Sequence, residues 1–324
     1  MHFRSDSTLY QLSRPALNLV SLLFKTISFV NLKIKARRQK HFPQLFIISV
    51  DNLSFGGTGK TPLVVAVGRA LEKRSVPFAI ISRGYRSGYE KKGALVEPAQ
   101  TASEVGDEPW LLKRRFPNQD VIIGRDRLRS IALAAARKNR IVILDDGLQT
   151  SQVKKDFSIM LVNPGHPYFY LRNFKFMMRR ETLVLNYWQR IHKGETVPPG
   201  TYGFSAEDFL DSRNLQVDIC AARIIAFSAL GDNERFKNDM GRYHLEAFQG
   251  FSDHHTFSAT DIQALENLRR EKGASWMVCT EKDFCKINNF LDEVIPLIYV
   301  RNRIELPDDA IAQIIKHATE KGFL

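Results

Sequence analysis

The stretch "QLFIISVDNLSFGGTGKTPLVV" (residues 44–65) decides the fold. An apolar run is followed by a glycine-rich loop and then by a segment with helical spacing, which is the order found in phosphate-binding loops. Glycines let backbone N–H groups close around phosphate oxygens, ahead of a helix N-terminus whose dipole favours anions. Ser54 stands where the full Walker A pattern has glycine. The surrounding order of elements nevertheless predicts a nucleotide site.

Specific roles follow from this loop. Lys60 is expected to reach the β- and γ-phosphates of ATP, and the Thr61 hydroxyl to take a place on Mg²⁺. The run "RIVILDD" (residues 140–146) ends in Asp145 and Asp146, which would supply the carboxylate that manages the metal. The remaining nucleotide-binding residues are expected to be Gly56, Gly57, Thr58 and Gly59.

The first half of the chain predicts a doubly wound, mainly parallel α/β domain of the P-loop NTPase type. Apolar runs without polar alternation are typical of strands buried on both faces. They are separated by helical segments such as "TPLVVAVGRALEKR" and "RLRSIALAAARK". The runs are "QLFIISV", "FAIISRGY", "DVIIG", "RIVILDD" and "FSIMLV".

A second, smaller α/β domain is expected towards the C-terminus. From about residue 185 the chain becomes rich in Gly, Pro and acidic residues, which indicates a junction. The later runs "ARIIAFSAL", "SWMVCT" and "VIPLIYV" read as strands around a helix that Ser258 or Thr260 could cap and Gly273 could close. The expected division is residues 1–42, 43–205 and 206–324.

Residues 15–34 form an apolar segment with Lys25 in its middle and no signal-peptide cleavage pattern. On a helix the polar residues make one narrow stripe, which suits a helix in a membrane interface better than a span. The basic residues that follow would each contribute about 1 kcal/mol near anionic headgroups. An ordinary amphipathic helix with a solvated basic face is the alternative. The stripe comprises Asn18, Ser21, Lys25 and Ser28, and the basic residues are Lys33, Lys35, Arg37, Arg38 and Lys40.

The charge and cysteine content narrow the function classes. The net charge of +12 favours an anionic partner. Nucleic acid is not expected, because no aromatic-bearing recognition motif accompanies the basic residues. Three cysteines without metal-ligand spacing fit a reducing compartment.

Other polar motifs lie in loops that could serve chemistry. Asp107 in "GDEP" follows a glycine and precedes a proline, although a helix-capping acid is the competing explanation. His254 or His255 in "DHH" could act with a carboxylate as an acid–base partner. Arg83 and Arg127 follow strands and would make phosphate forks if they face a cleft.

Together these motifs resemble the family of tetraacyldisaccharide 4'-kinases, which phosphorylate the lipid A disaccharide precursor. The resemblance runs through most of the chain. It is carried, in order, by "GGTGKTP", "SRGY", "GDEP", "DDGLQ", "DHH" and "TEKD".

The resemblance implies two α/β domains with ATP and Mg²⁺ on the first, and a lipid A disaccharide 1-phosphate as acceptor. It implies that the protein lies at the cytoplasmic face of the bacterial inner membrane, peripheral or shallowly inserted through its N-terminal helix. No obligate protein partner is expected. Asp107 would be the general base and His254 its partner, with His255 the less favoured choice. The other expected site residues are Lys60 and Asp146 in catalysis, Arg83, Tyr85, Arg127, Gln149 and Arg180 on the substrate, and Thr61, Asp145 and Glu181 on the metal.

Two positions depart from the family pattern. Thr150 stands where "DDGxQ" usually continues with His, and "FKFMMRRE" replaces a Pro/Gly-rich stretch while keeping its final Arg180 and Glu181. A P-loop kinase of another phosphorylated acceptor, and a nucleotide-binding regulator without turnover, are therefore the rival hypotheses.

Overall fold

The computed structural model describes residues 8–53, 59–85, 87–164, 171, 182–190, 196–231, 233–253, 255–287 and 295–324. The chain divides into two compact units. The first contains residues 3–204 and 304–324, and the second contains residues 205–303. The strands β8 (Thr201–Asp211) and β12 (Leu297–Glu305) each begin in one unit and end in the other.

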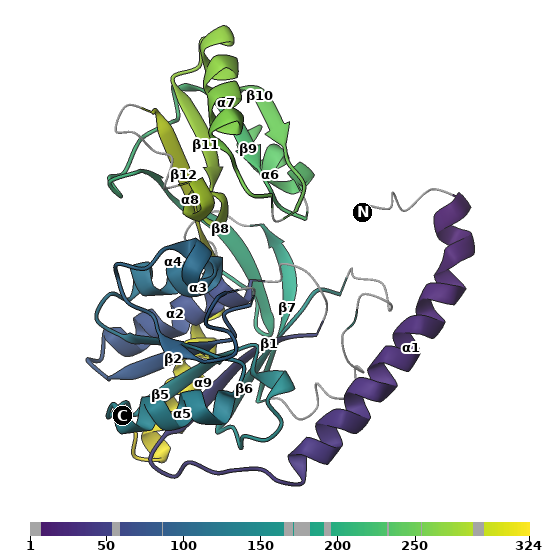
Figure 1. The fold of residues 1–324 in the computed structure, drawn as a ribbon, viewed down its shortest axis with the longest axis vertical. Coiled ribbons are helices and arrows are strands. Elements are labelled where there is room, and N and C mark those ends of the chain that lie inside the picture. The colour runs from purple at the N-terminus through teal and green to yellow at the C-terminus, as the bar shows by residue number, and fades with distance from the viewer. Residues whose placement is uncertain are drawn as a thin grey trace. The chain divides into compact units, whose positions relative to one another are not determined.

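The first unit has a mainly parallel sheet in the order β7-β6-β1-β5-β2-β4-β3 (Figure 1). β1 pairs in parallel with β5 and β6, and only the short β3 is antiparallel to its neighbour among the pairings described here. The strands are β1 (Phe46–Asn52), β2 (Phe78–Ser82), β3 (Ala94–Leu95), β4 (Asp120–Ile123), β5 (Ile141–Asp145), β6 (Phe157–Val162) and β7 (Leu183–Arg190).

Helices cover both faces of this sheet, as its two-sided burial requires. α5 packs through Ile131 on the face that carries Ile47. On the opposite face, Gly68 of α2 lies against the ring of Phe116, which also contacts Phe78. The helices of the unit are α1 (Thr8–Ala36), α2 (Lys60–Glu72), α3 (Ala102–Val105), α4 (Asp107–Arg115), α5 (Arg127–Ala136), the 3₁₀ turn η1 (Gly147–Gln149) and α9 (Asp308–Glu320).

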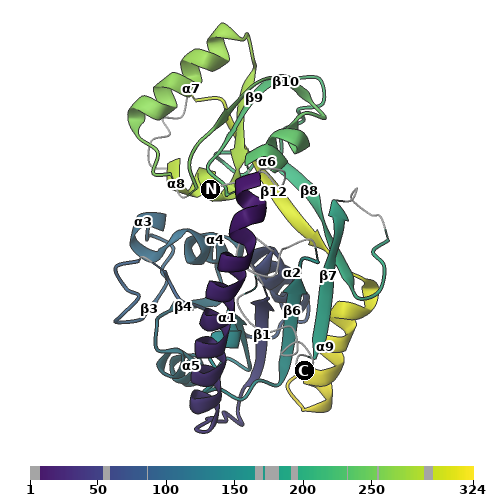
Figure 2. The same cartoon turned by 90° about the vertical axis from the view of Figure 1, so that its right-hand side faces the viewer.

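The last helix differs from the expected division, which placed residues 206–324 together. α9 belongs to the first unit and runs beside its strands (Figure 2). His317 packs edge-on against Phe157 at 5.1 Å between ring centroids, and Lys321 pairs with Asp156 at 2.6 Å. Non-local contacts of this kind leave no periodic signal in the sequence.

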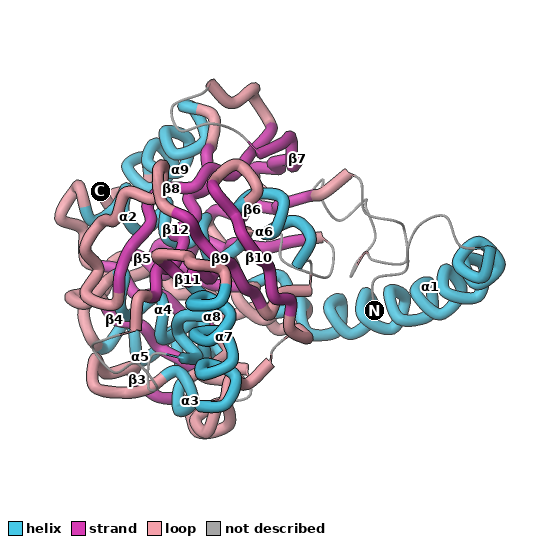
Figure 3. The backbone as a smooth tube through the Cα atoms, turned by 90° about the horizontal axis from the view of Figure 1, so that it is seen from above, coloured by secondary structure: helices cyan, strands magenta, loops and turns pink. Residues whose placement is uncertain are grey.

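The second unit is a smaller parallel sheet in the order β10-β9-β11-β12 (Figure 3). α7 and α8 pack on one face through Leu265 and Phe284, and α6 packs on the other through Phe236. Ser258 caps α7 by accepting from Asp261 N, and Gly273 follows the helix with φ 60°. The elements are β9 (Arg223–Ser228), α6 (Asn233–Met240), β10 (His244–Gly250), α7 (Ala259–Glu271), β11 (Trp276–Thr280) and α8 (Glu281–Ile287).

The N-terminal helix α1 has the reverse of the usual exposure pattern. Ser21 and Lys25 of the polar stripe are buried, whereas eight apolar residues of the helix are between 43% and 71% exposed. Within the described chain, the segment Leu17–Ala36 passes the length and hydropathy test for a membrane-crossing helix. The exposed apolar residues are Leu19, Val20, Leu22, Leu23, Phe24, Ile27, Val30 and Ile34.

Candidate active site

The carboxyl ends of β1 and β5 lie side by side in the first unit, because Val50 pairs with Asp145. In open α/β sheets, ligands bind beyond this edge. The segments that leave β1 and β5 are the predicted phosphate loop and the "DDGLQ" turn, so the fold brings these two motifs together.

Gly59 and Lys60 begin α2 at this edge. Gly59 has φ 94°, and a Cβ there would collide with the ring of Phe204, so both conformation and space require glycine. Lys60 donates from Nζ to Asn52 Oδ1 at 3.1 Å, and Thr61 follows in the first turn. Gly56, Gly57 and Thr58 lie outside the described residues.

Asp145 ends β5 with a buried carboxylate. Ser82 Oγ donates to its Oδ2 at 3.3 Å, whereas its Oδ1 is buried without a hydrogen-bond partner. Burial, followed by the negative charge of Glu108, raises the pKa of Asp145 to about 7, against an opposing effect of Lys60. This carboxylate is therefore short of positive charge and of donors.

Arg127 supports Asp145 through the backbone. Its guanidinium donates to the carbonyls of Gly124 at 3.2 Å and Asp145 at 3.1 Å, and the residue is only 9% exposed. Burial lowers the pKa of Arg127. These contacts use two of the five guanidinium N–H groups within the wall of the site, and the phosphate fork stays a prediction.

The turn after β5 is tightly constrained. Asp146 has φ 59° and ψ 50°, a left-handed conformation that non-glycine residues rarely adopt. The backbone of Gln149 lies in η1, and half-buried Thr150 ends that turn by donating from its N–H to the Gly147 carbonyl at 2.8 Å.

The "GDEP" loop is fixed by a short preceding helix. Thr101 and Glu104 form a capping box around α3, and hydrogen bonds from Thr101 lower the pKa of Glu104. Gly106 then has φ 96°, and half-buried Asp107 is the first residue of α4. After burial, the negative charge of Glu108 in this loop is the next cause of the raised pKa of Asp145.

Arg83 and Tyr85 follow β2 as an exposed pair. The Arg83 guanidinium lies 5.8 Å from the Tyr85 ring centroid, and its Nε donates to Glu90 at 2.7 Å. Tyr85 is 61% exposed, so much of its ring faces solvent beside Arg83. Arg180 and Glu181 lie outside the described residues.

In the second unit, the His255 ring contacts a carboxylate and an aromatic ring. Its Nε2 lies 3.2 Å from Asp261 Oδ2, and its ring stacks on Phe251 at 4.8 Å between centroids. Asp261 is also the acid of the α7 capping box. These contacts fix the orientation of the His255 ring, and His254 lies outside the described residues.

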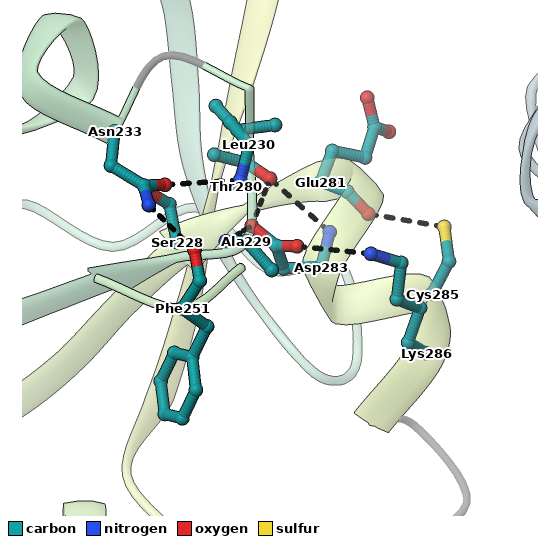
Figure 4. Close-up of polar contacts among 10 residues, drawn as sticks. All are labelled: Ser228, Ala229, Leu230, Asn233, Phe251, Thr280, Glu281, Asp283, Cys285 and Lys286. Atoms are coloured by element: carbon teal, nitrogen blue, oxygen red, sulfur yellow. Dashed lines mark hydrogen bonds and ion pairs between the residues drawn. The ribbon is translucent and has the colours of Figure 1, made fainter. Parts of the chain in front are cut away.

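The "TEKD" motif forms a buried polar cluster (Figure 4). Asp283 is completely buried, and its Oδ2 accepts from Thr280 Oγ1 at 2.7 Å and from Ala229 N at 3.1 Å. Lys286 Nζ lies 3.5 Å from its Oδ1. The motif thus joins α8 to the end of β9, and Lys286 is engaged within the cluster.

A neighbouring amide extends this cluster to the start of the "DHH" loop. Asn233 Oδ1 accepts from Ser228 Oγ at 2.7 Å and from Leu230 N at 3.0 Å, while its Nδ2 donates to Phe251 O at 2.7 Å. One side chain therefore fixes the turn after β9 relative to the end of β10.

Sequence reasoning missed Asp51 and Asn52, the two polar residues at the end of β1. Both are buried. The available signal was their placement in an otherwise aliphatic strand directly before the glycine loop, since buried polar residues require partners.

Mg²⁺ fits the groups at this edge. The orphaned Asp145 Oδ1 is a hard oxygen ligand, and Mg²⁺ commonly uses one or two carboxylates together with substrate phosphates. Across the described ranges, no group of three or more His, Cys, Asp or Glu side chains could hold a metal ion by itself. The nucleotide would therefore have to complete the coordination.

Comparisons with known proteins match one family along most of the chain. The sequence model of the tetraacyldisaccharide-1-P 4'-kinase family matches residues 13–320. A tetraacyldisaccharide 4'-kinase from Koribacter versatilis is 32% identical over 292 residues, covering 83% of this chain and 88% of the relative. One from Methylobacterium nodulans is 33% identical over 253 residues, covering 73% of each chain.

A solved structure shows the same fold. The "apo" form of LpxK from Aquifex aeolicus, crystallised in complex with ATP, superposes with a TM-score of 0.76 at 25% identity. The match covers 95% of this chain and 99% of that one. With the family model spanning both units, the chain belongs to the tetraacyldisaccharide 4'-kinase family.

Proposed function

We propose that this chain transfers the γ-phosphate of ATP to the 4'-hydroxyl of a tetraacyldisaccharide 1-phosphate, the precursor of lipid A. The observation that carries the proposal is the juxtaposition of Lys60 at the head of α2 with the orphaned carboxylate oxygen of Asp145 at the end of β5. A cation for phosphate and an oxygen ligand for metal are what phosphoryl transfer requires at one edge of a sheet.

On the nucleotide side, Lys60 binds the β- and γ-phosphates and the backbone of Gly56 to Gly59 surrounds them. Phosphoryl transfer spreads negative charge over the transferred oxygens, so a fixed ammonium group stabilises the transition state. The helix dipole of α2 adds to this field.

Asp145 and the Thr61 hydroxyl would hold Mg²⁺, with Glu181 as a further expected ligand. When bound, the metal neutralises charge on the β- and γ-phosphates. Asp146 follows Asp145 in the turn and keeps a second carboxylate at this edge.

On the acceptor side, Asp107 accepts the proton of the 4'-hydroxyl as the oxygen attacks phosphorus. His254 orients that carboxylate and balances its charge, while Arg83, Tyr85, Gln149 and Arg180 bind the sugar and its phosphate. The half-buried place of Asp107 at the start of α4, next to Glu108, whose charge acts on Asp145, supports this assignment. Arg127 donates to the backbone carbonyl of Asp145 and so supports the end of β5.

The lipid substrate brings the protein to the cytoplasmic face of the inner membrane. The exposed apolar side of α1, with Lys33, Lys35, Arg37, Arg38 and Lys40 at its end, suits a helix lying in the interface. A buried polar stripe with an exposed apolar face is the opposite of what a water-facing helix needs. No obligate protein partner is required by this assignment.

An acceptor comparison tests the proposal. Radiolabelled ATP and the purified chain are incubated with tetraacyldisaccharide 1-phosphate, soluble phosphorylated sugars or nucleosides, and products are separated by thin-layer chromatography. Label in the lipid alone supports the proposal, label in a soluble acceptor supports another kinase, and ATP binding without any transfer supports a regulator.

A further inference from the structure

The buried carboxylate of Asp51 links β1 to the turn that carries the metal-site aspartates. Asp51 is 1% exposed. Its Oδ2 accepts a short hydrogen bond from Ser49 Oγ, and its Oδ1 accepts another from Leu148 N. Leu148 lies in η1, immediately after the "DDG" turn. The Asp51 side chain therefore links strand β1 to the "DDGLQ" turn.

The turn needs such support because Asp146 is left-handed. A non-glycine residue in this region costs about 1–2 kcal/mol. Strand β1 holds the backbone on both sides of it: Asp146 N donates to Val50 O at 3.0 Å, and Leu148 N donates to Asp51. Removing the Asp51 contact leaves one of these two restraints.

The packing beneath the turn is equally restrictive. A Cβ on Gly147 would collide with Ser49 Oγ, the same atom that donates to Asp51. Ser49 therefore contacts both Asp51 and the backbone of Gly147. The turn has no free space towards β1 into which it could move.

We propose that Asp51 is a positioning residue for phosphoryl transfer, which fixes the turn bearing Asp145 and Asp146 so that their carboxylates meet the nucleotide and its metal. The proposal rests on the proposed function for its kinetic consequences. A carboxylate suits this task because two oxygens accept from two donors at once, where an aliphatic side chain accepts none.

The cost of burying the Asp51 carboxyl favours a specific role for this side chain over the filling of space. Burial raises the pKa of the Asp51 carboxyl, against the lowering effects of Lys155 and of its hydrogen bonds to Ser49 and Leu148. Burying an acid costs free energy that an apolar side chain in the same place would not cost, so packing alone does not call for an acid here.

The test uses the full-length protein with four substitutions: Asp51→Ala, Asp51→Asn, Ser49→Ala and Ile131→Ala. Ile131 is buried in α5 among apolar side chains, so its truncation reports lost packing without the loss of a hydrogen bond. Steady-state kcat and KM for ATP are measured on the lipid acceptor. Titration calorimetry then measures ATP affinity with and without Mg²⁺ and without acceptor.

Asp51→Ala is expected to lower kcat at least about tenfold with KM for ATP within about threefold, and to reduce the Mg²⁺-dependent gain in ATP affinity about fivefold. Asp51→Asn keeps an acceptor for Leu148 and should restore kcat to within about threefold of wild type. Ser49→Ala should lower kcat about threefold, and Ile131→Ala should change neither measurement.

Equal kcat in Asp51→Ala and Ile131→Ala, or an Asn variant as impaired as the Ala variant, overturns the proposal. If Asp51→Ala does not fold, an unchanged kcat in Ser49→Ala overturns it instead. A wild type that binds Mg²⁺ and ATP but does not phosphorylate the lipid defeats the proposed function, while the calorimetric comparison still decides the role of Asp51.

Discussion

The ammonium nitrogen of Lys60 lies 3.1 Å from Asn52 Oδ1, so the lysine that begins α2 is tethered to the last residue of β1. Asn52 is buried, which fixes the acceptor in place. A phosphate oxygen adds charge–charge attraction to a hydrogen bond from the ammonium group, which a neutral amide oxygen does not. We therefore expect Lys60 to exchange Asn52 for phosphate when ATP binds.

Lys60→Ala should lower kcat/KM for ATP at least about 100-fold, because it removes a cation that stabilises the transferred phosphate. Asn52→Ala removes only the tether and should cost at most about tenfold. Initial rates at varied ATP concentration separate the two. Equal losses would show that the tether, and not the charge, is what matters.

Asp107→Asn should lower kcat by about 10²–10⁴ while leaving ATP affinity unchanged, because a general base acts only on the acceptor proton. The two histidines provide a matched comparison. His254→Ala should lower kcat, whereas His255→Ala should lower the melting temperature, since its ring stacks on Phe251 and faces Asp261. The opposite pattern would make His255 the partner of Asp107.

Asp145 predicts a pH dependence of stability in the ligand-free protein. Its pKa is about 7 in the folded state against an ordinary value of 3.8, so the folded protein retains a proton that the unfolded chain has released. This stabilisation is complete below about pH 4 and is lost as the pH rises through about 7.

Asp145→Asn removes that loss, because an amide does not ionise. The difference in unfolding free energy, variant minus wild type, should grow by about 2 kcal/mol between pH 5 and pH 8. Urea unfolding at the two pH values measures it. A constant difference would mean that Asp145 is already ionised at pH 5.

Asp283→Ala should destabilise the protein by about 3–5 kcal/mol, because it leaves Lys286 and the Ala229 N–H buried without their acceptor. Asp283→Asn keeps an oxygen for Thr280 and should cost less. ATP affinity should stay within about twofold in both variants, since the nucleotide residues lie in the first unit. Loss of ATP binding in a variant that remains folded would contradict a purely structural cluster.

Local patterns predicted the fold where each strand is buried on both faces. The aliphatic runs before Asn52 and Asp145 became β1 and β5, and the glycine loop leads into α2, as expected. β7 and β8 were missed because they lie in the segment interpreted as a junction. The Gly, Pro and acidic residues of that segment are turn and loop signals, which outweighed the short apolar runs of these strands.

The residues proposed for the site could be named from the sequence, but their contacts could not. Lys60 and Asp145 follow from motif spacing, whereas the burial of Arg127 behind Asp145 depends on how β4 and β5 pair with β2. Asp51 belongs to no familiar motif, and its function depends on a donor 97 residues away. Such long-range pairs require the fold itself.

The most direct test of the account is the position of the transferred phosphate. Tetraacyldisaccharide 1-phosphate in detergent micelles is incubated with ATP, Mg²⁺ and the wild-type chain, and the product is analysed by mass spectrometry and phosphorus NMR. We predict one added phosphate as a second monoester on the distal sugar, absent with Lys60→Ala. A pyrophosphate at the existing 1-phosphate, or an unchanged lipid in the presence of bound ATP, would contradict the account.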